Sequence, residues 1–370
     1  MRLGGAPPKA GRSGGEIRSL NTVRGVAALM VAVYHAPVMF GVAHTLPHAY
    51  LGVDLFFVLS GFVIPHAYAD RIAGGLPLPR FAQLRLARLY PLLFLATLAG
   101  FALWSLRAAT GHAPFSIHAL IGLPLNLLLL PAHPAASPEG VAFPFITQSW
   151  SIAWEIVLCL AYFAWARWVR RGAELLAAVG VLALGLLVLA RGDGDGGWTT
   201  PTFWIGGVRA FAAFWLGVGV HRAVRGGLAL SGAWRAAILA LAVVVTAYVT
   251  LIHHTWWWAD FACAAVGFPA IIIGAALSRH WLLENRLGDL LGEASFSVYL
   301  LHGLTIDGLS IGLKALPHLH PTAHMGLGAA WMAALVVGSW ICWRWVETPL
   351  RVRFSRPRAA PALAPDAVAA

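Results

Sequence analysis

The chain has 370 residues, of which 59% are hydrophobic and only 11% are charged, and its formal net charge is +11. Many of its apolar runs reach the length of about 20 residues that a helix needs to cross a bilayer, which excludes a soluble globular protein. The basic residues lie between these runs, where they orient a membrane protein, so we expect the lipid bilayer as a partner and no nucleic acid.

Because hydrocarbon offers no water to the backbone, each spanning segment must close its own hydrogen bonds. The sequence therefore predicts an all-α, polytopic membrane helical bundle with about ten transmembrane helices. Residues 1–17 and 351–370 are expected to be cytoplasmic tails of a domain covering 18–350. The expected spans are 20–41, 50–69, 89–107, 149–168, 174–190, 201–221, 234–252, 257–277, 293–313 and 324–345.

Two connecting segments need separate interpretation. The run IHALIGLPLNLLLLP, residues 117–131, is short for a span and contains Pro124, so it is either an eleventh crossing or a re-entrant or interfacial piece. If it does not cross, most arginine-rich loops fall on the side of the N-terminus, which favours ten spans with both termini cytoplasmic. The loop RGDGDGG, 191–197, is typical of a flexible external turn.

Three ionisable residues are predicted at one depth near the outer side. His35 lies about 9 Å below the outer end of the first span, Glu155 lies at a similar depth in the fourth, and Asp54 is slightly shallower in the second. Buried charges in a membrane are costly and are functional candidates by default. A histidine with a carboxylate is a usual general-base arrangement. Alternatively, His35 is only hydrogen-bonded in a helix interface and Asp54 caps a helix end.

Two further groups of polar residues share a helical face. Arg85 and Arg88, at the cytoplasmic surface, are spaced to hold the phosphates of an anionic ligand, or they only anchor the helix by the positive-inside rule. Ser295, Tyr299 and His302 form a polar stripe that lines a cavity or makes hydrogen bonds between helices.

The cysteines do not indicate a metal or a disulfide framework. Cys159, Cys263 and Cys342 are scattered within apolar segments, without the spacing of a metal cluster. We expect them to be packing residues, and we expect no metal site.

Five segments in order carry a family resemblance: IRSLNTVRGVAALMVAVYH, GVDLFFVLSGFVI, RLARLYP, SWSIAWE, and ASFSVYLLH followed by ETPLR. From about Arg18 to Arg353, the chain resembles the acyltransferase-3 family of bacterial membrane O-acyltransferases, which acylate cell-envelope and exported carbohydrates. The resemblance implies ten membrane helices in the bacterial inner membrane and acyl-CoA as a cytoplasmic donor. It also implies a carbohydrate or lipid-linked glycan acceptor, and no permanently bound cofactor.

The resemblance also implies roles for individual residues. His35 matches the essential histidine, and Arg85 and Arg88 match the paired arginines near the donor. Arg18 and Arg24 match two arginines that flank the first helix, and they are expected to help bind the donor. Asp54 and Glu155 match the acids of two family segments, and Trp150, which begins the W-S-x-x-x-E segment, is a candidate for the substrate cavity. The chain departs from many members at Asn21, where they have Asp.

These residues predict that His35 acts as general base on a sugar hydroxyl, oriented by Glu155 or Asp54, with acetyl as the default acyl group. A covalent acyl-histidine route stays open, because histidine can also act as a nucleophile. Two other classes compete: a proton-coupled transporter, in which the same charges form a proton relay, and a non-catalytic subunit of a glycan assembly complex.

Overall fold

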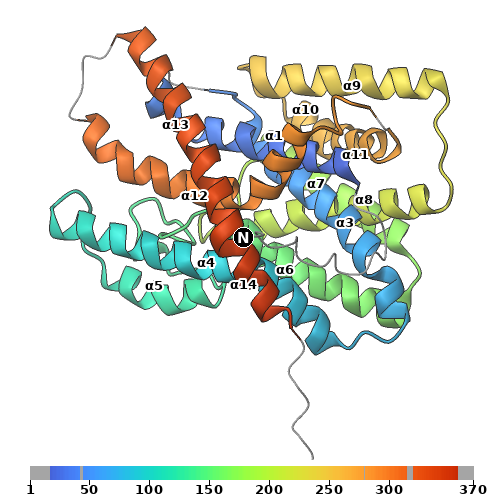
Figure 1. Ribbon diagram of the computed structural model, residues 1–370, viewed down its shortest axis with the longest axis horizontal. Coiled ribbons are helices and arrows are strands. Elements are labelled where there is room, and N and C mark those ends of the chain that lie inside the picture. The colour runs from blue at the N-terminus through green and yellow to red at the C-terminus, as the bar shows by residue number, and fades with distance from the viewer. Residues whose placement is uncertain (1–16, 42–44, 279, 315–319, 357–370) are drawn as a thin grey trace, which may run out of the picture.

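The computed structural model describes residues 17–41, 45–278, 280–314 and 320–356, so most of the two expected tails lies outside the described residues. Within these ranges every regular element is helical, apart from one isolated bridge between Val141 and Thr199. The predicted all-α bundle is therefore confirmed (Figure 1).

The α-helices are α1 (Arg18–Tyr34), α2 (Pro37–Phe40), α3 (Gly52–Ala73), α4 (Leu78–Ala109), α5 (Ile117–Leu127), α6 (Ser149–Ala164), α7 (Ala173–Arg191), α8 (Phe203–Arg225), α9 (Gly232–Leu251), α10 (Trp257–Ala262), α11 (Phe268–Leu277), α12 (Arg286–Lys314), α13 (Pro321–Cys342) and α14 (Thr348–Phe354). Short 3-10 helices are η1 (Ala49–Leu51) and η2 (Pro134–Ala136), and π-helical turns are η3 (Trp165–Val169), η4 (Cys263–Gly267) and η5 (Trp343–Glu347).

A helix lies at each of the ten predicted spans, and in the described part of the chain eight segments are long and apolar enough to cross a membrane. The two others are α1, with 17 residues, and α12, which has 29 residues and carries several charged side chains. Within the run 117–131, residues Ile117–Leu127 form α5. Its 11 residues extend only about 16 Å, too short to cross about 30 Å of hydrocarbon.

Prolines explain where two helices depart from the predicted spans. The first helix ends at Tyr34 rather than near residue 41, because Pro37 cannot continue it and instead begins α2. His35 therefore caps the C-terminal end of α1, instead of lying 9 Å inside a longer helix. The second difference is at α4, which begins directly after Pro77, before the predicted start of the third span, and continues through Pro91. Arg85 and Arg88 therefore belong to the same helix as the third span.

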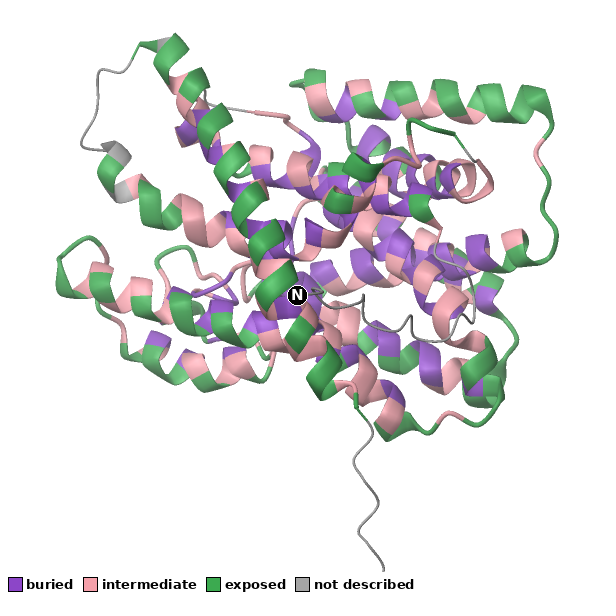
Figure 2. Ribbon diagram, viewed as in Figure 1, coloured by how far each residue is buried: buried purple, intermediate pink, exposed green. Residues whose placement is uncertain are grey.

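Glycines allow the central helices to approach each other closely. A Cβ atom on Gly61 of α3 would lie 1.9 Å from the carbonyl oxygen of Phe214 on α8, and one on Gly217 would lie 2.0 Å from that of Val58. Gly292 of α12 is packed just as tightly against Asn21 of α1. Small residues at such contacts are typical of helix pairs in membranes. Figure 2 agrees, because buried residues gather on the central helices while α9 and α13 are largely exposed.

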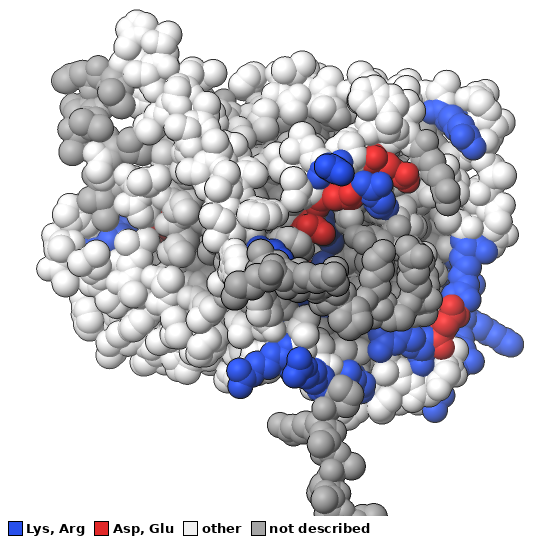
Figure 3. Space-filling model, in the orientation of Figure 1, with Lys and Arg blue, Asp and Glu red and all other residues white. Residues whose placement is uncertain are grey.

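Basic side chains are unevenly distributed over the visible face. In Figure 3 Lys and Arg gather toward the right and lower edges, whereas the left half, near α5, is almost free of them. Arg71, Arg222 and Arg225 lie at the ends of α3 and α8 that the prediction places in the cytoplasm. This asymmetry is what the positive-inside rule expects of the predicted orientation, which stays a prediction.

Candidate active site

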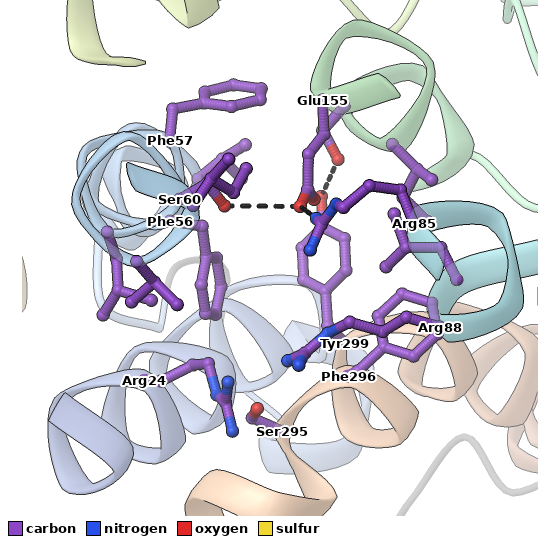
Figure 4. Close-up of a pocket in the computed structure, with 17 residues that line it drawn as sticks. Arg24, Phe56, Phe57, Ser60, Arg85, Arg88, Glu155, Ser295, Phe296 and Tyr299 are labelled. Atoms are coloured by element: carbon purple, nitrogen blue, oxygen red, sulfur yellow. Dashed lines mark hydrogen bonds and ion pairs between the residues drawn. The ribbon is translucent and has the colours of Figure 1, made fainter. Parts of the chain in front are cut away.

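A cavity between α1, α3, α4, α6 and α12 collects several of the predicted residues (Figure 4). Its polar lining comes from Arg24 of α1, Ser60 of α3, Arg85 and Arg88 of α4, and Glu155 of α6. α12 closes it with Ser295, Phe296 and Tyr299; Ser295 lies beside Arg24, and Phe296 lies beside Arg88. The arginine pair and two residues of the polar stripe, Ser295 and Tyr299, which are far apart in the sequence, thus line one cavity.

The two arginines of α4 have different surroundings. Arg85 is buried, and its Nη2 donates to Glu155 Oε1 at 2.7 Å; the Ser60 hydroxyl lies 3.4 Å from the same oxygen. Arg88, one turn further along α4, has no carboxylate within ion-pair distance among the described residues and points into the cavity (Figure 4). Arg85 therefore positions Glu155, and the guanidinium of Arg88 is left to interact with a ligand.

A second cavity adjoins the first and shares Arg24, Arg88 and Ser295 with it. It extends to Glu347 and Arg351, at the end of the last span that is predicted to face the cytoplasm. Together the two cavities extend from that end of the bundle to Tyr299, and the charged lining of the second consists of Arg24, Arg88 and Arg351 with Glu293 and Glu347.

Above the cavity, α6 and α12 are joined by a layer of hydrogen bonds. The hydroxyls of Ser151 and Tyr299 lie 2.7 Å apart, and Ser151 donates to the carbonyl of Gln148 at 2.9 Å. The Gln148 amide nitrogen lies 2.9 Å from Nε2 of His302, whose Nδ1 lies 3.3 Å from the carbonyl oxygen of Val298. Because an amide NH₂ and a carbonyl fix the proton on Nδ1, the Nε2 lone pair of His302 is already occupied.

His35 lies directly beyond this layer. Its ring centroid is 5.1 Å from that of His302 and 4.8 Å from that of Tyr34, and its side chain is solvent-accessible. Its Nδ1 lies 2.9 Å from the carbonyl oxygen of Val31, so Nδ1 carries the proton, and no described residue forms a hydrogen bond with Nε2.

Asp54 and Glu155 each face an arginine instead of His35. The Asp54 carboxylate receives two hydrogen bonds from Arg209 of α8, at 3.1 and 2.5 Å, and both side chains are almost fully buried. Arg209 also donates to the carbonyl of Gly196 at 2.8 Å. The predicted hydrogen-bonded orientation of His35 by one of these acids is thus absent among the described residues, and catalytic roles for both acids stay predictions.

Two other predicted residues lie away from the cavity. Trp150 is buried, with its ring over the Arg209 guanidinium at 5.7 Å, so it packs against the ion pair with Asp54 rather than lining the cavity. Arg18 donates to Asp289 at 3.0 Å near the surface. Arg24, by contrast, lines both cavities and donates to the carbonyl of Gly292 at 3.1 Å.

Several residues of the site were not predicted. Gln148 and Ser151 flank Trp150 in a segment that was read only for its tryptophan and glutamate. Arg209 falls inside the predicted span 201–221, and the cost of an unpaired buried charge could have predicted a carboxylate partner for it. The loop 191–197, expected to be a flexible turn, instead contributes Gly196 and Asp195 to the outer side of the site. No group of three or more metal-binding side chains gathers in the described ranges.

Comparisons with known proteins identify the family of the chain. A family described as "Acyltransferase domain", the acyltransferase-3 type, matches residues 17–344. One curated relative, described as "Protein 2 in picA locus" of Rhizobium radiobacter, is 37% identical over 180 residues, which are 46% of this chain and 91% of the relative. No solved structure gives a significant match.

Proposed function

Because the chain belongs to the acyltransferase-3 family and is a multi-pass membrane acyltransferase, we propose that it moves an acyl group from cytoplasmic acyl-CoA to a hydroxyl of a cell-envelope or exported carbohydrate. The proposal places the protein in a bacterial inner membrane and takes acetyl as the acyl group. A transporter or a non-catalytic subunit is not favoured, because the family match is to an acyltransferase domain.

The observation that carries this proposal is the position of Arg88. It lines both cavities, and no carboxylate of the described chain lies within ion-pair distance of its guanidinium. A guanidinium pairs with phosphate in a bidentate geometry, and such charge-assisted bonds are about twice as strong as neutral ones. Arg88 is therefore suited to hold a phosphate of CoA, with Arg24 and Arg351 adding positive charge at the entrance.

The polar stripe of α12 gives the direction of the acyl chain. Ser295 lies beside the entrance, and His302 lies seven residues, or about 10 Å, further along the helix. The arm that links the CoA phosphates to the thioester would follow this stripe past Tyr299. The thioester would then approach His35 from the cytoplasmic side while the carbohydrate approaches from the outer side.

His35 supplies the base in this proposal. Its unoccupied Nε2 takes the proton of the acceptor hydroxyl, the hydroxyl oxygen attacks the thioester carbonyl, and the C–S bond breaks. The thiolate of CoA leaves and takes this proton from the His35 imidazolium, which returns the histidine to its neutral form. His302 is not suited to this role, because Gln148 occupies its Nε2.

The same unoccupied Nε2 also allows a covalent route, in which His35 itself attacks the thioester and then passes the acyl group to the hydroxyl. The two routes differ in one observable. Incubation with radiolabelled acetyl-CoA and no acceptor should leave stable label on the protein only if the covalent route operates, and His35→Ala should remove that label.

Donor binding provides the test of the proposal. Full-length protein in lipid nanodiscs is titrated with acetyl-CoA, and Arg88→Ala is expected to raise the Kd by about 10- to 100-fold, since a hydrogen bond to a charged group is worth about 1.5–3 kcal/mol. Arg88→Lys should recover part of the affinity, because it keeps the charge and loses the bidentate geometry. Arg222→Ala is the matched control, since Arg222 pairs with Glu174 away from the cavity. Unchanged affinity in Arg88→Ala would refute the assignment.

A further inference from the structure

A separate cavity opens at the end of the bundle opposite Arg88. It lies between the last turns of α4, the segments 112–116 and 135–147, and α12. The positive-inside orientation places this end on the outer side of the membrane. Unlike the apolar grooves on the lipid-facing surface, this cavity is lined by charged, aromatic and hydroxyl side chains together.

Three charged side chains line this cavity without a hydrogen-bond partner in the described chain. Arg107 lies 3.9 Å from Asp307, too far for a hydrogen bond, and its Nε is buried with no acceptor. Asp307 and Glu139 receive no hydrogen bond, and the Asp307 side chain is 61% exposed. Arg107 and Asp307 thus form a long ion pair, and the cavity offers donors at Arg107 and acceptors at the two carboxylates that make no hydrogen bond within the described chain.

An aromatic cluster forms one wall. Trp104 of α4 contacts Phe115 and Phe145, with ring centroids 6.2 and 6.1 Å away, and it is only partly buried. Flat aromatic rings beside hydrogen-bonding groups suit a ligand that has both apolar faces and polar edges.

The cavity leads toward the catalytic histidine. Thr147 and Leu304 form its inner end, and Thr147 directly precedes Gln148, which contacts His302. The His302 ring is in turn 5.1 Å from that of His35. A ligand held between Trp104 and Thr147 is thus positioned to extend toward His35 from the outer side.

We propose that this cavity binds an uncharged sugar unit of the acceptor carbohydrate. A pyranose ring can lie against Trp104 and exchange hydrogen bonds between its hydroxyls and Arg107, Glu139 and Asp307. With two carboxylates and one guanidinium, the cavity disfavours a uronate or a phosphorylated sugar, because like charges repel. That the bound sugar belongs to the acceptor rests on the proposed function, but sugar binding itself can be measured without any acyl donor.

The test is direct binding to full-length protein in nanodiscs with no acyl-CoA present. The probes are fluorescently end-labelled neutral oligosaccharides from dextran, mannan and galactan, and oligogalacturonate of the same length, followed by fluorescence anisotropy. At least one neutral probe should bind more tightly than oligogalacturonate, and Trp104→Ala should weaken its binding by about tenfold or more. Trp258→Ala, which removes an exposed tryptophan of α10 far from the cavity, should leave binding unchanged.

A double variant tests how the two carboxylates affect the choice between neutral and acidic sugars. Replacing both acids, with Glu139→Gln and Asp307→Asn, leaves Arg107 as the one charged group of the three and should raise the affinity for oligogalacturonate relative to the neutral probe. The proposal is overturned if no neutral probe binds, if Trp104→Ala binds as well as the unaltered protein, or if oligogalacturonate binds best without these changes. Failure of the proposed function is a different result, namely sugar binding without acetyl-CoA binding or acyl transfer.

Discussion

Two carboxylates predicted at similar depth, Asp54 and Glu155, occupy different kinds of surroundings. Asp54 is held by two hydrogen bonds from Arg209, in a part of the bundle where both side chains are almost completely buried. Glu155 receives hydrogen bonds from Arg85 and, at 3.4 Å, from Ser60, and its side chain is 22% exposed. One ion pair joins α3 to α8, and the other forms part of a cavity wall.

The same contrast separates the two histidines. Both nitrogens of His302 have partners, whereas the Nε2 of His35 has none in the described chain. An ionisable group inside a membrane is a candidate for function where a substrate can reach it, as at His35, which is exposed, and at Glu155, which lines the first cavity. We therefore expect changes at His35 and Glu155 to affect activity, and changes at Asp54 and His302 to affect the folded state.

The largest effect is expected from His35→Ala. Loss of a positioned base should lower acyl transfer by about 10²- to 10⁴-fold while acetyl-CoA binding and the melting temperature stay close to those of the unaltered protein. Transfer of radiolabelled acetyl from acetyl-CoA to native envelope glycan in membranes, with CoA release as a second readout, measures this. The control is His302→Ala, which should lower the melting temperature because it leaves buried Gln148 without its partner. Equal transfer by His35→Ala and the unaltered protein would return His35 to a packing role.

The second largest effect is expected from breaking the buried ion pair between Arg209 and Asp54. Arg209→Ala leaves the Asp54 carboxylate buried without its partner, and breaking a buried pair in this way costs about 3–5 kcal/mol. The yield of folded protein and its melting temperature in detergent should therefore fall sharply. The exposed pair between Arg222 and Glu174 is the matched control, because Arg222→Ala should cost about 1 kcal/mol or less. A stable Arg209→Ala protein with low activity would place Asp54 in the catalytic machinery after all.

The sequence predicted the helices well because long apolar runs are a strong signal in a membrane protein. It was weaker at their ends, since hydropathy continues through Pro37 while the backbone of α1 stops at Tyr34. At α4 the prediction placed a helix boundary where the structure has none. The basic segment with Arg85 and Arg88 was separated from the apolar run that follows it, but both belong to one helix.

The site was predicted only in part, for a geometric reason. Depth along a helix follows from residue number, and it placed His35, Asp54 and Glu155 at a similar level. The direction in which each side chain points depends on how the helices pack, and that is fixed by distant contacts such as the one between Asp54 and Arg209, 155 residues apart. The partner of each charge therefore had to come from the structure.

A smaller effect is expected from Glu155→Gln. The amide keeps a hydrogen-bond acceptor for Arg85 and removes the negative charge, so the folded state should lose about 1 kcal/mol or less at this partly exposed position. If Glu155 positions the arginines that bind the donor, the KM for acetyl-CoA should rise by about tenfold with little change in kcat. Steady-state kinetics at saturating acceptor separate the two constants. A fall in kcat with unchanged KM would instead make Glu155 a direct participant in the reaction.

The smallest effect is expected from Tyr299→Phe, which removes one hydroxyl from the layer between the cavity and His35. Ser151 loses its partner at 2.7 Å but keeps its hydrogen bond to the carbonyl of Gln148, so stability should fall by about 1 kcal/mol. Because the ring itself remains against Phe56, the wall of the cavity keeps its shape and donor affinity should be unchanged. Thermal unfolding and acetyl-CoA titration of the same nanodisc sample test both statements. A loss of transfer far beyond this small change in stability would mean that the hydroxyl contacts the reacting thioester, and the layer would then belong with the cavity rather than with the groups that hold the fold.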